Sequence, residues 1–123
     1  MLRTSFMALA LLAGTVSLAY ADGNPAKGKD VFKRCAVCHT DTKDGGNGLG
    51  PNLFGIVGRK AASLPDFSYS GPLKKSGLVW TEPNLTKWVA GPGRMVPGTK
   101  MAFPGITSKT QQADLVAYLK TVK

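Results

Sequence analysis

The sequence predicts an all-α fold in which three to four short helices are joined by long loops. The final stretch of the chain carries apolar residues at helical spacing. No segment alternates apolar and polar residues as a half-buried β-strand would. In addition, 14 of the 15 Gly and all 8 Pro fall beyond residue 21, which is too many for a bundle of long helices.

The first 21 residues have the pattern of a secretory leader. Arg3 gives a positive start, residues 6–18 form an apolar run, and Ala19-Tyr20-Ala21 has the small-x-small form of a cleavage site. The run is shorter than the ~20 residues of a membrane-spanning helix, so an uncleaved anchor is the weaker alternative. We therefore expect a cleaved leader at 1–21, export to the periplasm and no stable membrane insertion. A single domain should then occupy 22–123.

The first helix is predicted to begin at Pro25 and to run to Cys35. Asn24 before it is a favoured cap, and Pro suits the first helical position. Gly28 inside it costs ~1 kcal/mol relative to Ala. Close approach of another helix would explain this glycine, and simple tolerance is the alternative.

The segment that organises the chain is Cys35-Ala36-Val37-Cys38-His39. C-x-x-C-H is the signature of covalent haem attachment, in which two thiols bind the macrocycle and the histidine binds its iron. If this segment ends a helix, all three side chains lie on one face, because residues three and four apart are neighbours there. We predict that Cys35, Cys38 and His39 bind one haem c.

Two cysteines at this spacing allow three other interpretations. A thioredoxin-like pair normally opens a helix after a strand, and no strand–helix alternation is visible. A zinc site needs four ligands, whereas His39 is the only histidine and no second cysteine pair exists. A short structural disulfide in an exported protein is the third alternative.

The remaining helices are predicted from caps and apolar spacing. A short helix is expected at 72–76, ending before Gly77, and another is expected to begin after Thr81 and end at Gly91. Residues 91–105 are so rich in Gly and Pro that we expect no regular element there. The last helix should begin after Ser108 and pack against the first.

The second axial ligand of the iron is predicted from the Pro- and Gly-rich loop. No second histidine exists, and the methionines outside the leader are Met95 and Met101. Met101 is bracketed by Pro97-Gly98 and Pro104-Gly105, which can hold the loop in one conformation. A thioether suits iron and raises its reduction potential. Lys100 is the competitor, although its amine must first lose a proton.

These motifs resemble those of class I c-type cytochromes, the family of mitochondrial cytochrome c and its small soluble bacterial relatives. The resemblance rests on the C-x-x-C-H segment, on Gly50-Pro51-Asn52-Leu53 and on Pro97-Gly98-Thr99-Lys100-Met101. It covers essentially the whole chain beyond the leader, and it implies helices that cross near a glycine, with loops wrapped around the haem. It also implies that the Pro51 carbonyl accepts the second ring N–H of His39.

Further residues match family positions around the haem. The resemblance places Arg59, Tyr69 and Trp80 near the propionates, and Thr99 and Trp88 beside the methionine ligand. From the residues alone, core aromatics are the first choice for the two tryptophans, and a solvated surface charge is the alternative for Arg59.

The charge of the chain favours an acidic partner. The formal net charge is +9, and it becomes +8 when the leader with Arg3 is removed. A basic surface suits nucleic acid, anionic membrane or an acidic protein, but no nucleic-acid motif is present. We expect a monomer that docks on acidic faces of redox proteins, such as a membrane cytochrome complex, an oxidase, a reaction centre or a periplasmic dehydrogenase.

The sequence therefore predicts a soluble periplasmic electron carrier and not an enzyme. Its iron would be held by His39 and Met101, and Cys35 and Cys38 would hold the macrocycle. If Met101 is not a ligand, the alternative is a five-coordinate haem protein that binds gases or acts as a peroxidase.

Overall fold

A computed structural model describes residue 10 and residues 23–123, and in this part of the chain the structure is helical. The helices are α1 (Pro25–Phe32), α2 (Gly71–Lys75), α3 (Glu82–Ala90), α4 (Pro92–Met95) and α5 (Lys109–Thr121). Over these residues the only β pairing is an isolated antiparallel bridge between Lys60 and Val79. The all-α prediction is confirmed, whereas the predicted number of helices, three to four, is too low.

The predicted leader at 1–21 lies outside the described residues, apart from residue 10. From residue 23 onward, and at residue 10, no helix is long and apolar enough to cross a bilayer.

The predicted starts of α1, α3 and α5 are confirmed by their caps, whereas α2 begins one residue before the predicted position 72. The Asn24 side chain accepts hydrogen bonds from the N–H groups of Ala26 and Lys27, at 2.9 and 3.2 Å. Helices α2, α3 and α5 are capped in the same way, by the hydroxyl groups of Ser70, Thr81 and Ser108. Each cap satisfies a donor that has no partner inside its helix.

Two predictions are wrong, one about the end of the first helix and one about the stretch at 91–105. Helix α1 ends at Phe32 and does not reach Cys35, because residues 33–38 form successive tighter turns. The 91–105 stretch contains α4, although we expected no regular element. A single turn can form there because Pro92 occupies the first helical position, where its missing N–H is not needed. The Arg94 guanidinium also donates to the Ala90 carbonyl, at 2.7 Å.

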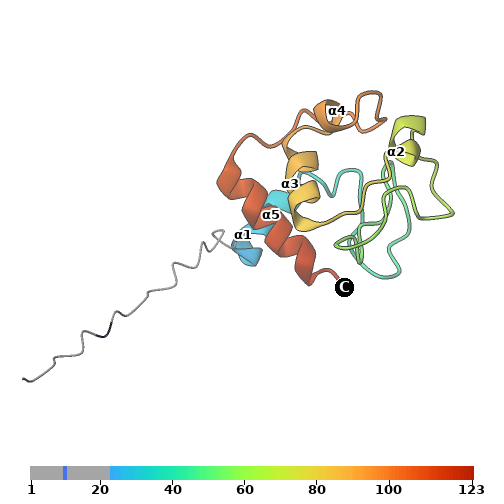
Figure 1. Ribbon diagram of the computed structural model, residues 1–123. Coiled ribbons are helices and arrows are strands. Elements are labelled where there is room, and N and C mark those ends of the chain that lie inside the picture. The colour runs from blue at the N-terminus through green and yellow to red at the C-terminus, as the bar shows by residue number, and fades with distance from the viewer. Residues whose placement is uncertain (1–9, 11–22) are drawn as a thin grey trace, which may run out of the picture.

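The first and last helices pack together as predicted. In Figure 1, α5 crosses α1, and α3 lies beside α5. Gly28 is at the crossing, because a Cβ added there would fall on the Asp114 carbonyl of α5 and 2.8 Å from the Tyr118 Cβ. The backbone N–H of Asn24 also donates to the Asp114 carboxylate, at 2.7 Å. Close approach explains Gly28, and tolerance does not.

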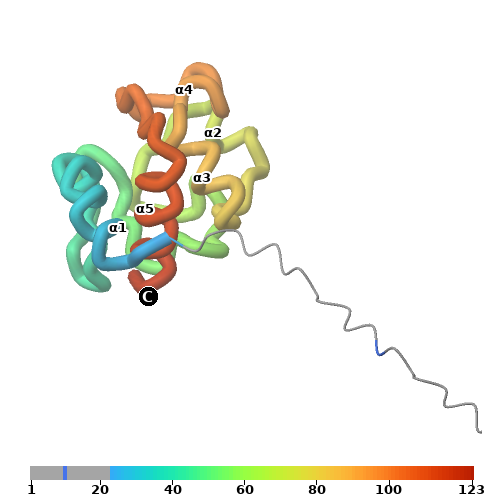
Figure 2. Tube along the Cα trace, turned by 90° about the vertical axis from the view of Figure 1, so that its left-hand side faces the viewer, coloured from blue at the N-terminus to red at the C-terminus, as the bar shows by residue number. Residues whose placement is uncertain are grey.

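Helices α1, α3 and α5 form one side of the molecule, and the loops with α2 complete the other side (Figure 1). Ile106 and Leu115, each 1% exposed, lie at the centre of a core shared by α1, α3 and α5. Helices α2 and α4 lie at one end of the molecule, and the C-terminus lies at the other end (Figure 2). A cavity lies between the long loops and the core, and the site is found in this cavity.

The Gly28 crossing gives a direct test of this packing. Gly28→Ala should lower the free energy of unfolding by about 1–3 kcal/mol through overpacking, even though Ala favours a helix by ~1 kcal/mol. Gly71→Ala in α2 is the matched control, because nothing lies within 4 Å of its added Cβ. Denaturant titration of both variants measures the difference, and equal stability would contradict the close approach.

Candidate functional site

A cavity of about 600 Å³ lies between the helices and the loops. This volume is within the ~300–1,000 Å³ usual for cofactor sites. Its lining is mostly apolar and comes from residues between Phe32 and Leu119. All four predicted site residues belong to this lining: Cys35, Cys38, His39 and Met101. The cavity thus brings together four predicted site residues that are up to 66 positions apart in the sequence.

The C-x-x-C-H segment is held by backbone hydrogen bonds of turn type. The N–H of Cys35 donates to the Phe32 carbonyl at 2.7 Å, and the N–H groups of Cys38 and His39 both donate to the Cys35 carbonyl, at 3.0 and 2.9 Å. The segment therefore brings the three side chains to one cavity, as expected. It does so in turns that follow α1, and not as the end of the helix.

His39 is fixed by its surroundings. Its Nδ1 lies 2.7 Å from the Pro51 carbonyl oxygen, and because a carbonyl can only accept, Nδ1 carries the proton. This confirms the predicted contact with Pro51. Burial lowers the pKa of His39, an effect opposed by the Pro51 hydrogen bond. The neutral ring therefore keeps a free lone pair on Nε2, the form that binds a metal.

Gly50 sets the space beside this ring. A Cβ at this position would lie 2.7 Å from Nδ1 and 2.8 Å from Nε2 of His39. The N–H of Gly50 also donates to the Cys38 carbonyl, at 2.8 Å. The loop that carries Pro51 can approach His39 this closely because residue 50 has no side chain.

The Cys35 thiol does not have the lowered pKa of a redox-active cysteine. Burial is the main cause that raises the pKa of Cys35 to about 11, with Cys38 also raising it and Arg34 lowering it. A reactive thiol needs a lowered pKa. Both cysteines are free, so they form no disulfide. Across residues 10 and 23–123, no group of three His, Cys, Asp or Glu could hold a metal ion.

The loop after α4 brings Met101 to the cavity. Met101 is half-buried, whereas Met95 packs against the core from α4 and is not part of the cavity lining. Lys100 also reaches the lining, but it is exposed and its Nζ lies 3.5 Å from the Ser68 hydroxyl. Among the candidate second ligands, Met101 is the uncharged side chain that faces this space.

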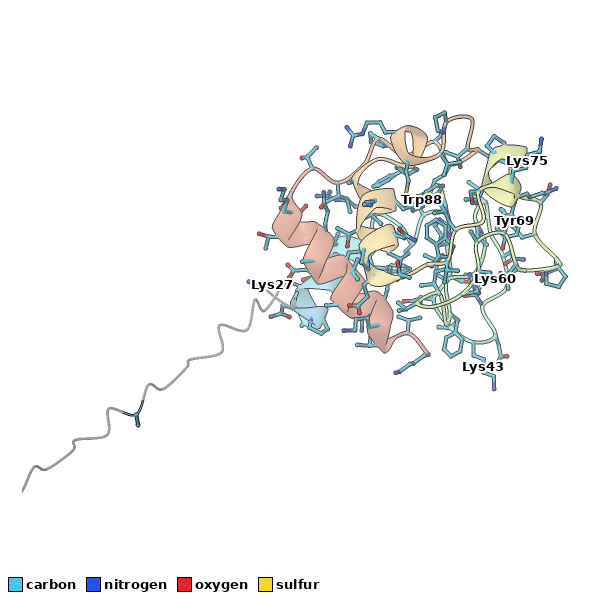
Figure 3. The ribbon with its side chains drawn as sticks, in the orientation of Figure 1. Lys27, Lys43, Lys60, Tyr69, Lys75 and Trp88 are labelled. Atoms are coloured by element: carbon cyan, nitrogen blue, oxygen red, sulfur yellow. The ribbon has the colours of Figure 1, made fainter. Side chains whose placement is uncertain are left out.

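Buried aromatic residues and Arg59 complete the walls. Trp80 and Trp88 line the cavity and contact each other edge to face, with ring centroids 5.1 Å apart. Figure 3 shows Trp88 on α3 and Tyr69 on the loop that precedes α2. The Arg59 guanidinium donates to the carbonyls of Phe54 and Asn52, at 3.1 and 2.9 Å. Burial lowers the pKa of Arg59, so this side chain is not a simply solvated charge.

Comparison with known proteins gives the family. The family model described as Cytochrome c matches residues 25–123. The chain belongs to the cytochrome c family. It is 46% identical over 103 residues to cytochrome c2 of Rhodomicrobium vannielii, a match that covers 84% of this chain and 82% of that protein. It is also 48% identical over 100 residues to cytochrome c of Theileria annulata, which covers 80% and 86%.

A solved structure gives the same result for the fold. The structure of cytochrome cH from Methylobacterium extorquens matches with a TM-score of 0.76 and 45% identity, over 80% of this chain and 99% of that one. The predicted class I cytochrome c fold is confirmed. The cofactor is covalently bound haem c with its iron, and the chain is an electron carrier that works with redox partners, not an enzyme.

Two contacts at the site were not predicted from the sequence. One is the packing of Gly50 against His39, although Gly50 belongs to a motif on which the family resemblance rests. The other is a hydrogen bond from the Tyr118 hydroxyl to the Asp41 carboxylate, which joins α5 to the loop that follows His39. The Tyr118 ring also packs on Phe32, with centroids 5.4 Å apart. Asp41 and Tyr118 are 77 positions apart, and no local pattern signals such a pair.

This hydrogen bond predicts a stability difference at alkaline pH. The hydrogen bond that the Tyr118 hydroxyl donates to Asp41 is the main reason why the pKa of Tyr118 is raised from about 10 to about 12. The bond therefore stabilises the fold fully below pH ~10, the pKa of an unfolded Tyr, and the contribution is lost as pH rises through about 12. Tyr118→Phe should be less stable than the wild type at pH 8, and the difference should shrink between these values.

Denaturant titrations at fixed pH measure this difference. As a control, Tyr118→Phe should add a much smaller pH dependence in an Asp41→Ala background, because the acceptor is gone and only burial still raises the pKa of Tyr118. A difference that stays constant through pH 12 would show that the hydrogen bond makes no contribution.

Proposed function

We propose that this protein carries single electrons in the periplasm by means of one six-coordinate haem. The thioether attachments are Cys35 and Cys38, and the axial ligands are His39 and Met101. The observation that carries the proposal is that one cavity is lined by all four side chains. The four predicted residues therefore already line the space in which we propose that the haem is bound.

The residues fit the cofactor in their chemistry. Haem c, when bound, supplies an iron that alternates between Fe(II) and Fe(III). His39 offers a neutral ring nitrogen whose orientation is set by Pro51. The thioether of Met101 is uncharged in both oxidation states and favours the reduced iron. With both positions filled, the protein keeps water and small molecules off the metal.

The walls limit the rearrangement that accompanies electron transfer. The C-x-x-C-H segment and Thr40 after it are tied to the loop at 50–53 by backbone hydrogen bonds, from Gly50 to Cys38 and from Leu53 to Thr40, each 2.8 Å. Trp80 and Trp88 are 6% and 8% exposed and provide rigid apolar surface. A wall that does not move when the iron changes charge keeps the barrier to transfer small.

The periplasmic location rests on the leader pattern at residues 1–21. Arg3, the apolar run at 6–18 and the small-x-small site at 19–21 together suit export and cleavage. The mature protein would then be the single domain at 22–123. The family model begins at residue 25, which is compatible with this boundary.

Cations at the mouth of the cavity give the protein its preference for acidic redox partners. Arg34 and Lys100 belong to the lining and are exposed. Two other exposed cations are engaged, since Lys33 pairs with Asp30 at 3.3 Å and Arg94 donates to the Ala90 carbonyl. Figure 3 shows that further lysines, Lys27, Lys43 and Lys75, are spread over the surface. A positive mouth steers acidic proteins toward the site of electron transfer.

Replacement of Met101 tests the ligand set. Met101→Ala should open the iron of the reduced protein to carbon monoxide, leave the haem attached and lower the reduction potential, because the thioether is lost. Met95→Ala is the matched control and should bind no carbon monoxide. Visible spectra of both variants with and without the gas give the answer. If the wild type itself binds carbon monoxide, the iron is five-coordinate and the protein is a gas-binding or peroxidase-like protein.

The positive mouth predicts a salt-dependent reaction with anions. Oxidation of the reduced protein by hexacyanoferrate(III) should slow by about tenfold or more from low to high ionic strength. Lys100→Gln should weaken this dependence more than Lys75→Gln, which removes the same charge outside the cavity lining. Stopped-flow kinetics at several salt concentrations measure both slopes. Equal slopes for the two variants would contradict steering by the mouth.

A further inference from the structure

One dipeptide in the loop that precedes Pro51 is chemically unstable. Of the four Asn in the chain, at positions 24, 47, 52 and 84, only Asn47 is followed by Gly. The backbone nitrogen of the next residue can attack an Asn side chain, and Gly leaves this nitrogen least hindered because it has no side chain. The other three Asn precede Pro, which has no N–H, or Leu, whose side chain hinders the attack. Asn47–Gly48 is therefore the strongest site for spontaneous deamidation in this chain.

The fold needs both residues of this dipeptide. A Cβ on Gly48 would lie 2.9 Å from the Cys38 carbonyl oxygen, so a larger residue would push the loop away from the C-x-x-C-H segment. The Asn47 side chain accepts a hydrogen bond from the N–H of Asn52 at 2.9 Å, and its amide nitrogen donates to the Asp66 carbonyl at 3.4 Å. Asn47 thus ties together two loops of the cavity wall. The reactive dipeptide is a consequence of this packing.

The contacts that need Asn47 and Gly48 also restrain their reaction. The N–H of Gly48 donates to the Gly50 carbonyl at 3.0 Å, so the nitrogen that would attack is engaged. For the ring to close, this bond must break and the Asn47 side chain must turn away from Asn52 and Asp66. The Asn52 N–H alone would polarise the amide and favour attack, but an engaged nitrogen does not use this advantage. The chemistry must therefore wait until the loop opens locally.

We propose that Asn47–Gly48 is a deamidation site that the folded loop protects, and that its reaction unties the two loops. In the first step the Gly48 nitrogen bonds to the side-chain carbonyl carbon of Asn47, and the bond from this carbon to the amide nitrogen breaks. Ammonia leaves with the proton of the Gly48 N–H, so a cyclic succinimide remains. One water molecule then opens this ring at either carbonyl, giving aspartate or isoaspartate at position 47. This inference does not depend on the haem ligands of the proposed function.

Either product removes the contact between the loops. A carboxylate has no N–H, so it cannot donate to the Asp66 carbonyl and instead repels that oxygen. Isoaspartate also lengthens the main chain just before Gly48, whose close approach to Cys38 leaves no room for an extra methylene group. The same stretch leads to Pro51, whose carbonyl oxygen lies 2.7 Å from Nδ1 of His39. Deamidation should therefore loosen the wall that orients this histidine.

Incubation of the folded and the unfolded protein tests the protection. Haem-loaded protein is held in mildly alkaline buffer, with and without guanidinium chloride, and samples are digested with trypsin at intervals. The peptide 44–59 contains Asn47 and Asn52, and fragment masses show which of them has lost ammonia and gained water. Asn47 should deamidate about tenfold or more slowly in the folded protein, because each reaction first needs local opening. Since the haem is covalent, the two samples differ in fold and not in composition.

Asn52 and two variants of Asn47 complete the test. Asn52, which is followed by Leu53, should stay intact in both samples. Asn47→Gln keeps an amide but needs a larger ring, so position 47 should gain no mass in either sample. Asn47→Asp reproduces one product and should unfold at a lower denaturant concentration than the wild type. Its added negative charge lowers the net charge of a basic chain, so a loss of stability would come from the broken contact and not from charge repulsion.

Three results would overturn the proposal. Equal rates at Asn47 in the folded and unfolded samples would mean that the loop gives no protection. An intact Asn47 in the unfolded sample would mean that the site does not react. Unfolding of Asn47→Asp and the wild type at the same denaturant concentration would mean that deamidation does not untie the loops. None of these results bears on Met101, whose carbon monoxide test judges the proposed function separately.

Discussion

The site depends on a small set of hydrogen bonds that tie the C-x-x-C-H segment to the loop at 50–53. The N–H of Gly50 binds the Cys38 carbonyl, the N–H of Leu53 binds the Thr40 carbonyl, and the Pro51 carbonyl accepts from the His39 ring. These bonds join two stretches that have no helix or strand to order them. If they were absent, the histidine would be free to rotate and one wall of the cavity would be lost.

The rest of the fold supports a cavity with few regular elements. Loops need partners for their polar groups, and in the described part of the chain no buried side-chain nitrogen or oxygen lacks one. Arg59 shows how this is achieved, since one guanidinium serves two loop carbonyls and also lines the cavity. The helices are needed mainly to fix the ends of these loops, and the α1–α5 crossing is where the two ends of the domain meet.

Much of this could be predicted because the decisive signals are local. The C-x-x-C-H spacing, the caps at Asn24, Thr81 and Ser108, and the apolar spacing of the last helix each lie within a few residues. The failures have physical reasons. The end of α1 depends on turns formed around Cys35, and α4 depends on Arg94, whose guanidinium donates to the Ala90 carbonyl four residues earlier, a contact that a Gly- and Pro-rich pattern does not signal. The Asp41–Tyr118 bond depends on the tertiary fold alone. The ligand role of Met101 remains a prediction, supported by its place in the cavity lining.

The packing of α1 on α5 has a consequence for the order in which the molecule forms. The hydrogen bond from Asn24 to Asp114 joins residues 90 positions apart, so the first helix has no partner until almost the whole chain is available. Contacts of such long range make folding slow, because the loop between them must close first. A chain that emerges N-terminus first therefore keeps Cys35 and Cys38 accessible until its last helix appears.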